Sequence, residues 1–401
     1  MSLSTVQAPG ATTRGALDPE SAEFADLLQQ LSEEFAATAA HYDRHSEFPH
    51  ANLRRLHEHG LLALTVPRAL GGSEATLAQA RRVIGAVARG EPSTALVLVM
   101  QYLQHSRLQQ NQAWPLHLRQ QLAREAVAQG ALINALRVEP ELGTPARGGL
   151  PATVAQRVDN GWLLSGRKIY STGIPGLTWL AVWARSDEPE PRVGTWLVHR
   201  DSPGIRIEET WDHLGMRATG SHDVIFDQVW VPLEQAVDIQ PADVPRPSEL
   251  DSKGVLWLAV LLSAIYDGVA RAARDWLLGW LAQRTPANLG APLSSLPRFQ
   301  ELIGRIDALL LSNRVLLDAA AEGRIAPGEA TQVKYLVTSN AISAVELGLE
   351  AIGNPALARG NPIERHYRDV LCSRIHTPQN DAILGAVGRA AFALPSRGAQ
   401  V

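Results

Sequence analysis

The segment that decides the fold is Gly166-Arg-Lys-Ile-Tyr-Ser-Thr-Gly173, and an apolar stretch, Trp179 to Asp187, follows it closely. Another segment, Val138-Glu-Pro-Glu-Leu-Gly-Thr144, precedes it. A third, Trp211-Asp-His-Leu-Gly-Met-Arg-Ala-Thr-Gly-Ser221, comes later and runs into Val224 to Pro232. Each segment alone has only the residues of a strand, a turn and a second strand. The three segments indicate a particular fold only when they are taken together and in their order along the chain.

The region that contains these segments, residues 131–237, has the composition of an antiparallel β-domain. Six of the ten tryptophans lie in it. Its short apolar runs, such as Thr153 to Val158 and Thr195 to His199, are bounded by turn residues such as Asp159-Asn-Gly161 and Pro203-Gly204. Residues 238–250, which hold three prolines, are predicted to form a linker.

Helical patterns flank this region on both sides. In residues 19–130, apolar side chains recur at the spacing of one helix face, namely Phe24, Leu27, Leu28, Leu31 and Phe35. Two further helices are expected there, at 51–59 and 76–89. In residues 251–395, four windows low in proline predict a helical bundle, over 252–284, 298–322, 328–352 and 381–392. Residues 1–18 are small and polar, and we expect them to be disordered.

Composition excludes several classes of protein. The chain has 401 residues, 45% hydrophobic and 19% charged, which suits a folded core of more than one unit. A net charge of −4 argues against a nucleic-acid partner. The single cysteine, Cys372, excludes an intrachain disulfide and indicates a reducing, cytoplasmic location. The longest apolar run, Val255 to Ile265, is too short to span a membrane and is predicted to be a core helix.

Several familiar catalytic and binding motifs are absent from the sequence. No Gly-x-Gly-x-x-Gly follows a strand and no phosphate-binding Gly-Lys-Ser/Thr loop occurs, so a dinucleotide fold is not supported. No His-Glu-x-x-His is present, and we expect no metal site. No Gly-x-Ser-x-Gly is found either, which argues against a serine hydrolase.

Taken in order, the three segments resemble the acyl-CoA dehydrogenase superfamily of flavoproteins. The resemblance extends from about Phe48 to Phe392 and includes Gly60 to Pro67 and Ile363 to Asp369. It implies an α+β multidomain fold: an N-terminal helical domain, a central antiparallel β-domain and a C-terminal four-helix bundle. It also implies a homotetramer and a flavin, FAD or FMN, between the β-domain and the bundle.

The resemblance maps the flavin contacts onto this chain. An aromatic-x-Ser/Thr pattern beside the ring falls on Tyr170 and Thr172, with Ser171 between them. Val138 and Thr144 fall where members contact the flavin from the first segment. Many members have a hydroxyl residue at the place of Val138, so one side-chain hydrogen bond to the ring is expected to be lost. These residue types suit a flavin, which proteins tune through aromatic walls and hydrogen bonds.

The resemblance also implies contacts from the bundle. Arg284 falls where members carry an arginine that reaches the FAD of a neighbouring subunit, and Arg298 lies near a family glutamine. Gly353 and Asn354 replace a glycine pair that approaches the adenosine end. An arginine suits a diphosphate because its guanidinium binds two oxygens at once.

The carboxylate base of the dehydrogenases is missing from its expected position. Most members that dehydrogenate supply a glutamate about seven residues after an Arg-Asp pair, and here that position holds Thr377, preceded by His376. The alternative location, on the first bundle helix, corresponds to Val255 to Ala259 and has no carboxylate. Glu249 and Asp251 lie too early and Asp267 too late. A positioned base contributes about 10²–10⁴-fold to such a reaction.

The late segment is similar to that of the flavin-dependent monooxygenases of the superfamily, such as dibenzothiophene monooxygenase and sulfur-acquisition oxidoreductases. Those enzymes receive reduced flavin from a separate reductase and use dioxygen in a dry pocket. The resemblance makes His376 the candidate hydrogen-bond donor and places Ser171 or Thr172 near flavin N5. His105, Gln101 and Thr377 are predicted to contact the substrate. A purely structural role for His376 or His105 is the alternative.

Three functional hypotheses follow. The first is a flavin-dependent monooxygenase acting on a small organic or organosulfur substrate. The second is an FAD-dependent acyl-CoA dehydrogenase with a displaced base, favoured by the dehydrogenase-like Gly215 to Gly220. The third is a non-catalytic flavin-binding protein, against which the retained polar residues Tyr170 to Thr172 argue.

Overall fold

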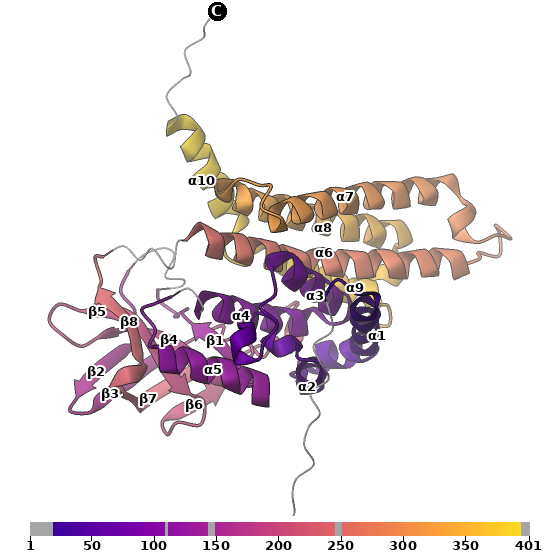
Figure 1. Ribbon diagram of the computed structural model, residues 1–401. Helices are drawn as coiled ribbons and strands as arrows, with labels where there is room; N and C mark the ends of the chain where they lie inside the picture. The colour runs from indigo at the N-terminus through magenta and orange to yellow at the C-terminus, as the bar shows by residue number, and fades with distance from the viewer. Residues whose placement is uncertain (1–18, 109–110, 143–148, 245–250, 394–401) are drawn as a thin grey trace, which may run out of the picture.

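The computed structural model describes residues 19–108, 111–142, 149–244 and 251–393 (Figure 1). Within these ranges the chain forms ten α-helices and eight β-strands. Five helices come first, then the sheet, then five more helices. In Figure 1 the bundle lies across the N-terminal helices, and the sheet lies beside one end of the bundle. The predicted order of a helical domain, a β-domain and a second helical domain is confirmed.

The N-terminal helices are built from the apolar face that the sequence predicts. Phe24, Leu28, Leu31 and Phe35 are all buried, and the Ser21 side chain caps the first helix by accepting a hydrogen bond from the Phe24 amide. The five helices are α1 (Ala22–His45), α2 (His50–Glu58), α3 (Leu77–Gly90), α4 (Pro92–Leu108) and α5 (Leu116–Gln129).

The sheet is mixed, which corrects the expectation of a purely antiparallel β-domain. Its strands are β1 (Leu132–Leu136), β2 (Val154–Val158), β3 (Gly161–Lys168), β4 (Leu177–Ser186), β5 (Arg192–His199), β6 (Ile205–Glu208), β7 (Asp223–Pro232) and β8 (Ala236–Pro241). They are arranged as β6-β7-β3-β2-β4-β5-β8, and β1 also pairs with β4. Most pairs are antiparallel, but β1 and β2 both pair parallel to β4. Residues 137–176 separate β1 from β4, which is long enough for the crossover that parallel pairing needs.

The predicted linker is shorter than expected. Strand β8 continues to Pro241 and pairs with β5 as far as Arg192, so residues 238–241 belong to the sheet. Backbone pairing at the edge of a sheet tolerates the proline at this strand end. Residues 245–250 lie outside the described ranges, as do residues 1–18.

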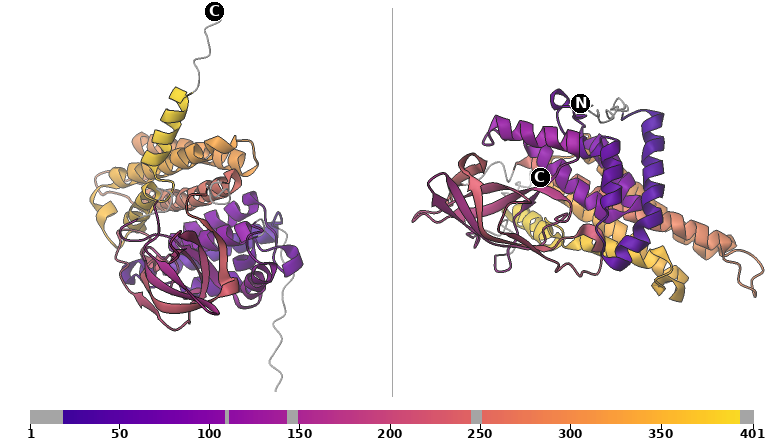
Figure 2. Two further views of the ribbon diagram at one scale, coloured as in Figure 1. Left: turned by 90° about the vertical axis from the view of Figure 1, so that its left-hand side faces the viewer. Right: turned by 90° about the horizontal axis from the view of Figure 1, so that it is seen from below.

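The C-terminal helices are α6 (Ser252–Gln283), α7 (Pro297–Ala321), α8 (Ala330–Ile352), α9 (Pro362–Leu371) and α10 (Asn380–Ala393). Four of them, α6, α7, α8 and α10, follow the predicted windows, whereas α9 falls in none of them. Asp251 caps α6 by accepting the Gly254 amide. Helix α6 is long and apolar enough to cross a membrane, but most of its apolar stretch is buried inside the protein. The left view of Figure 2 shows it between the other bundle helices and the N-terminal helices.

Helices α3 and α6 approach each other closely where both have glycine. A Cβ atom on Gly268 would lie 2.7 Å from the carbonyl oxygen of Gly85, which is too close for any larger residue. This contact joins the N-terminal helices to the bundle in one continuous apolar core that also reaches the sheet. The relative placement of sheet and bundle is therefore set by packing.

The third sequence segment meets the late segment directly. The Met216 amide donates to Asp369 at 2.7 Å, and the Arg368 guanidinium donates to the Leu214 carbonyl and to Asp43. Gly215 has no room for a side chain, because a Cβ there would lie 2.3 Å from the Arg368 carbonyl oxygen. The turn after β6 is thus held against α9, close to the chain that leads to His376.

Candidate active site

The first two sequence segments lie side by side at the end of β1 and β3. The Ile169 amide donates to the Val138 carbonyl at 3.0 Å, and Asn134 donates to the Thr172 carbonyl at 3.0 Å. Val138, Tyr170, Ser171 and Thr172 are therefore brought together, as the sequence predicts. Thr144 lies outside the described residues.

A buried ion pair fixes these two segments to each other. The Lys168 ammonium donates to Glu139 at 2.6 Å, and the two side chains are 0% and 1% exposed. Thr153 Oγ and the Ala152 and Thr153 amides also donate to this carboxylate. Burial lowers the pKa of Lys168 to about 8, although Glu139 opposes the shift. The pKa of Glu139 is lowered overall, because the bonds from Lys168 and Thr153 outweigh its burial.

The side chains of Tyr170 and Ser171 have the features of a flavin site. Ser171 is 1% exposed, and its Oγ has no hydrogen-bond partner among the described residues. A buried hydroxyl without a partner is costly, and a ligand atom would satisfy it. Tyr170 is 53% exposed and its backbone has a strained φ of 54°, a feature common at ligand sites. An aromatic face beside an unsatisfied hydroxyl fits the isoalloxazine ring of a flavin.

Neighbouring side chains hold Tyr170 and Thr172 in place. The rings of Trp211 and His213 stack at 3.6 Å, and the Tyr170 ring meets both edge-on. The Thr172 hydroxyl lies 3.0 Å from the Ser221 hydroxyl. The third sequence segment thus supports the second one from the side.

His376 lies where the chain passes the middle of α6. Its Nδ1 forms a short hydrogen bond with the hydroxyl of Tyr266, which is fully buried. Burial, and then the nearby Lys334 ammonium, lower the pKa of His376 to about 4, so the imidazole is neutral at physiological pH. Thr377, beside it, is exposed.

The backbone already uses the side chain of Gln101, which was predicted to contact the substrate, whereas the substrate contact of His105 stays a prediction. The Gln101 amide is fully used by the backbone, because it donates to the Leu62 and Ala131 carbonyls and accepts from the Ile133 amide. His105 is buried, and burial lowers its pKa to about 4. Its Nε2 has no partner among the described residues. Gln101 therefore links α4 to β1, whereas His105 keeps one unused ring nitrogen.

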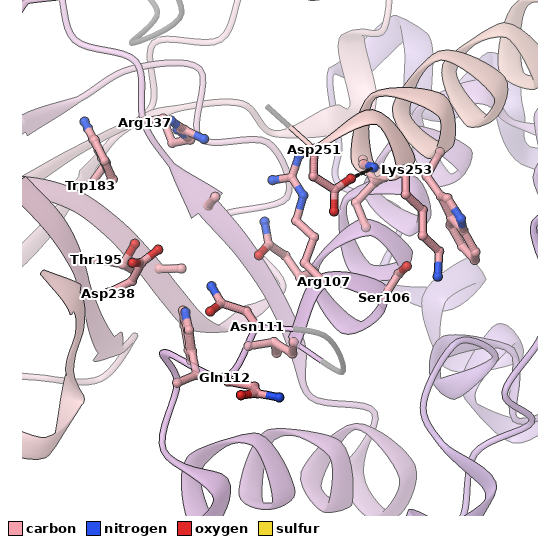
Figure 3. Close-up of a pocket in the computed structure, with 18 residues that line it drawn as sticks. Ser106, Arg107, Asn111, Gln112, Arg137, Trp183, Thr195, Asp238, Asp251 and Lys253 are labelled. Atoms are coloured by element: carbon pink, nitrogen blue, oxygen red, sulfur yellow. Dashed lines mark hydrogen bonds between the residues drawn. The ribbon is translucent and has the colours of Figure 1, made fainter. Parts of the chain in front are cut away.

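A cavity of about 490 Å³ opens between the end of α4, the sheet and the first turn of α6 (Figure 3). Its wall carries the cations Arg107, Arg137 and Lys253 and the carboxylates Asp238 and Asp251. Gln101, His105 and Thr377 are not among the residues that line it. Trp114, Trp183 and Trp257 also line it, so the wall combines charged groups with a larger apolar area.

Two pairs of side chains shape this cavity. The Arg137 guanidinium lies 5.0 Å from the centre of the Trp183 ring, a cation–π contact. Figure 3 shows Arg107 reaching toward Asp251. Both side chains lie close to Gly254. A Cβ atom added to that glycine would be 3.5 Å from Asp251 Oδ1 and 3.9 Å from Arg107 Nε. The start of α6 is thus a charged corner of the cavity.

The predicted bundle contacts lie away from this site. Arg284 ends α6, Arg298 begins α7, and Gly353 and Asn354 follow α8. Since consecutive bundle helices run in opposite directions, these residues gather at the end of the bundle far from the sheet (Figure 1). Within one chain they do not join Tyr170 to Thr172.

A displaced catalytic base would have to be a carboxylate on or near α6 that is not already used by other side chains. Asp267 is buried and accepts bonds from Arg271 at 2.7 Å and from Asn313 at 3.1 Å, so it is not available. Asp251 lines the cavity while it caps α6. Glu249 lies outside the described residues.

Sequence reasoning missed four residues of this region. Tyr266, Lys334, Glu139 and Lys168 are all buried polar groups whose partners come from distant parts of the chain. A lysine inside the apolar stretch Val333-Lys-Tyr-Leu-Val337 is a signal that such a partner exists, since buried lysines are rare.

Comparisons with known proteins agree with this architecture. Three acyl-CoA dehydrogenase domain families match the chain: the N-terminal domain over residues 18–111, the middle domain over 137–229 and the C-terminal domain over 254–391. YdbM of Bacillus subtilis, which carries a provisional acyl-CoA dehydrogenase name, is 32% identical, with 92% of this chain and 97% of YdbM covered.

Two further comparisons concern enzymes of another kind. The L-evernosamine nitrososynthase of a Micromonospora species is 30% identical, with 90% of this chain and 87% of that protein covered. The structure of KijD3 in complex with FMN and an amino-bearing dTDP-sugar superposes with a TM-score of 0.79 at 26% identity, with 93% of this chain and 94% of that chain covered.

Proposed function

Because the chain belongs to the acyl-CoA dehydrogenase superfamily of flavin oxidoreductases, we propose that it is a monooxygenase of that superfamily, using reduced flavin and dioxygen on a small organic substrate. One observation carries the proposal. At the place of the dehydrogenase carboxylate stand an exposed threonine, Thr377, and a neutral histidine, His376, held by Tyr266. A neutral imidazole of pKa about 4 is a poor base for a carbon acid and a good hydrogen-bond donor.

The chain's own residues would hold and orient the cofactor. Tyr170 offers an aromatic wall, Ser171 Oγ a free hydroxyl, and the backbone at Val138 a place close to both. When bound there, the flavin supplies the two electrons that activation of dioxygen requires. The half-buried histidine would contribute a hydrogen-bond donor to the site.

We propose a polar amine as the substrate class, because the cavity wall carries charges of both signs beside its apolar side chains. Asp238 and Asp251 suit a cationic nitrogen, while Arg107, Arg137 and Lys253 suit an anionic group elsewhere on the same molecule. The nitrososynthase relative and the amino-sugar ligand of KijD3 point the same way. Organosulfur compounds are the next class to test.

We also propose the protein's partners and its cellular location. A separate flavin reductase would deliver the reduced cofactor, since the sequence has no dinucleotide-binding turn of its own. A homotetramer would bring Arg284, at the far end of the bundle, to the flavin of a neighbouring subunit. A chain with one cysteine suits the cytoplasm.

A second candidate is an FAD-dependent acyl-CoA dehydrogenase. Asp251 favours it, because this carboxylate lines the cavity and would be the displaced base. The name of the YdbM relative favours it as well. In that case Asp251→Asn would abolish activity and His376→Gln would not.

Anaerobic mixing with a series of acyl-CoA thioesters tests the proposal. We expect the flavin bound to the purified protein to stay oxidised with every chain length. Rapid bleaching of the flavin by any acyl-CoA would overturn the monooxygenase proposal in favour of the dehydrogenase.

A further inference from the structure

The hydroxyl of Tyr266 is a buried donor with one partner. The side chain lies on α6 and is 0% exposed, and its hydrogen bond goes to His376 Nδ1. Burial raises the pKa of Tyr266 well above its usual value, so the phenol keeps its proton. A buried hydroxyl donates wherever an acceptor is available. Within the described ranges, Nδ1 is the acceptor that the structure offers it.

Because Tyr266 donates this hydrogen bond, it determines which ring nitrogen of His376 carries the proton. A neutral histidine has one protonated and one bare ring nitrogen. If Nδ1 accepts from Tyr266, the proton sits on Nε2. The opposite tautomer would place two donors against each other or leave the phenol proton without a partner, which is costly in the interior. The half-buried ring thus presents Nε2–H on its other side.

Lys334 on α8 holds the same segment from the opposite helix. Its ammonium is 0% exposed and donates to the Ser373 carbonyl at 2.8 Å and to Asn380 Oδ1 at 2.9 Å. These acceptors lie three residues before His376 and four residues after it, so one side chain closes the loop on both sides. Both acceptors are uncharged, and the positive charge therefore acts on its surroundings. It disfavours a second positive charge on the imidazole.

We propose that Tyr266 and Lys334 are positioning residues of His376: the tyrosine hydroxyl holds the tautomer with the proton on Nε2, and the lysine fixes the loop and brings its positive charge near the ring. The use of that Nε2–H as a donor in the reaction rests on the proposed function. The tautomer itself does not, because it follows from the hydrogen bond alone.

Acylation of histidine by diethyl pyrocarbonate tests the tautomer without any turnover. The reagent attacks a bare ring nitrogen, and in the native protein the bare nitrogen of His376 is covered by Tyr266. Tyr266→Phe releases the ring to place its bare nitrogen at Nε2. We expect the rate of modification of His376, followed by mass spectrometry of its peptide, to rise about fivefold, as loss of one net hydrogen bond implies. The exposed His117 serves as the internal reference.

Tyr102→Phe is the matched control. Tyr102 is also fully buried, and its hydroxyl donates to the Leu61 carbonyl at 2.8 Å, away from His376. Its loss should leave the rate at His376 unchanged. Equal rates at His376 in Tyr266→Phe and Tyr102→Phe, measured with and without bound FMN, would overturn the role of Tyr266.

The role of Lys334 has its own measurement. The groups that face His376 are Tyr266 on α6 and Lys334 on α8, and Asp369 and Cys372 act on Tyr266 from α9 and the turn after it. The rate of modification against pH reports the pKa of His376, which we expect to rise above about 4 in Lys334→Met but to stay below its usual value, because burial is the larger cause of the shift. Lys334→Arg keeps the charge and should keep the profile. An unchanged profile in Lys334→Met would remove the electrostatic part of the proposal.

These results are separable from the proposed function. A rise in Tyr266→Phe together with a protein that fails as a monooxygenase would leave the positioning pair in place and reject only the reaction.

Discussion

Breaking the buried Lys168–Glu139 pair is the perturbation whose cost the structure defines best. Lys168→Met leaves the Glu139 carboxylate 1% exposed and without its cation. Loss of one partner of a buried ion pair costs about 3–5 kcal/mol. Three donors remain, the Ala152 and Thr153 amides and Thr153 Oγ. We therefore expect the lower end of the range, about 3 kcal/mol.

Urea unfolding followed by tryptophan fluorescence measures this loss, and FMN titration measures its effect on the site. Val138 precedes Glu139 directly and Tyr170 follows Lys168 by two residues, so loosening the pair should also weaken flavin binding. The double variant Glu139→Gln with Lys168→Met removes both charges and should recover most of the stability.

Arg305→Met is the control, since it breaks an exposed ion pair with Glu301 on α7 and should change neither quantity. A loss of less than about 1 kcal/mol of unfolding free energy in Lys168→Met, which is the scale of an exposed ion pair, would contradict this prediction. A double variant no more stable than the single one would contradict it as well.

Three further predictions concern other parts of the chain. Burial raises the pKa of Asp369 to about 7, so the stability that its protonated form provides is complete below about pH 4 and is lost as the pH rises through 7. Asp369→Asn, which keeps an acceptor for the Met216 amide, should therefore increase the free energy of unfolding by up to about 4 kcal/mol at pH 8 and change it little at pH 4, as urea titrations at the two values would show. Ser171→Ala should raise the dissociation constant of FMN about fivefold, because one hydrogen bond is lost, and should leave the unfolding of the flavin-free protein unchanged. Gly268→Ala should destabilise the protein by about 1–3 kcal/mol in the same assay, because its Cβ would meet the Gly85 carbonyl oxygen.

Helix faces were predictable from the sequence because they depend on local spacing. The face from Phe24 to Phe35 and the bundle windows came from periodicity and low proline content. Helix α4 was not placed, because it is apolar nearly all round and so shows no periodicity. Residues 238–241 of strand β8 were taken for linker because the prolines at 241, 245 and 247 outweighed the pairing with β5, which only the folded sheet shows.

The candidate site was predictable only where a motif carried it. Val138 and Tyr170 to Thr172 were grouped through a family resemblance, and the structure brings them together. The partners of His376 could not be predicted, since Tyr266 is 110 residues away along the chain and its role depends on tertiary packing. Gln101 shows the opposite case: its polar side chain suggested a substrate contact, but the backbone of β1 and its neighbours uses it completely.

Reoxidation of the reduced, FMN-loaded protein by dioxygen tests the central claim most directly. Stopped-flow spectroscopy would follow the return of oxidised flavin at several oxygen concentrations, with His376→Gln beside the native protein. The account predicts two resolved phases, a first that accelerates with oxygen and a second that does not, with the second phase faster in His376→Gln. A single slow phase, identical in both proteins, would contradict the account.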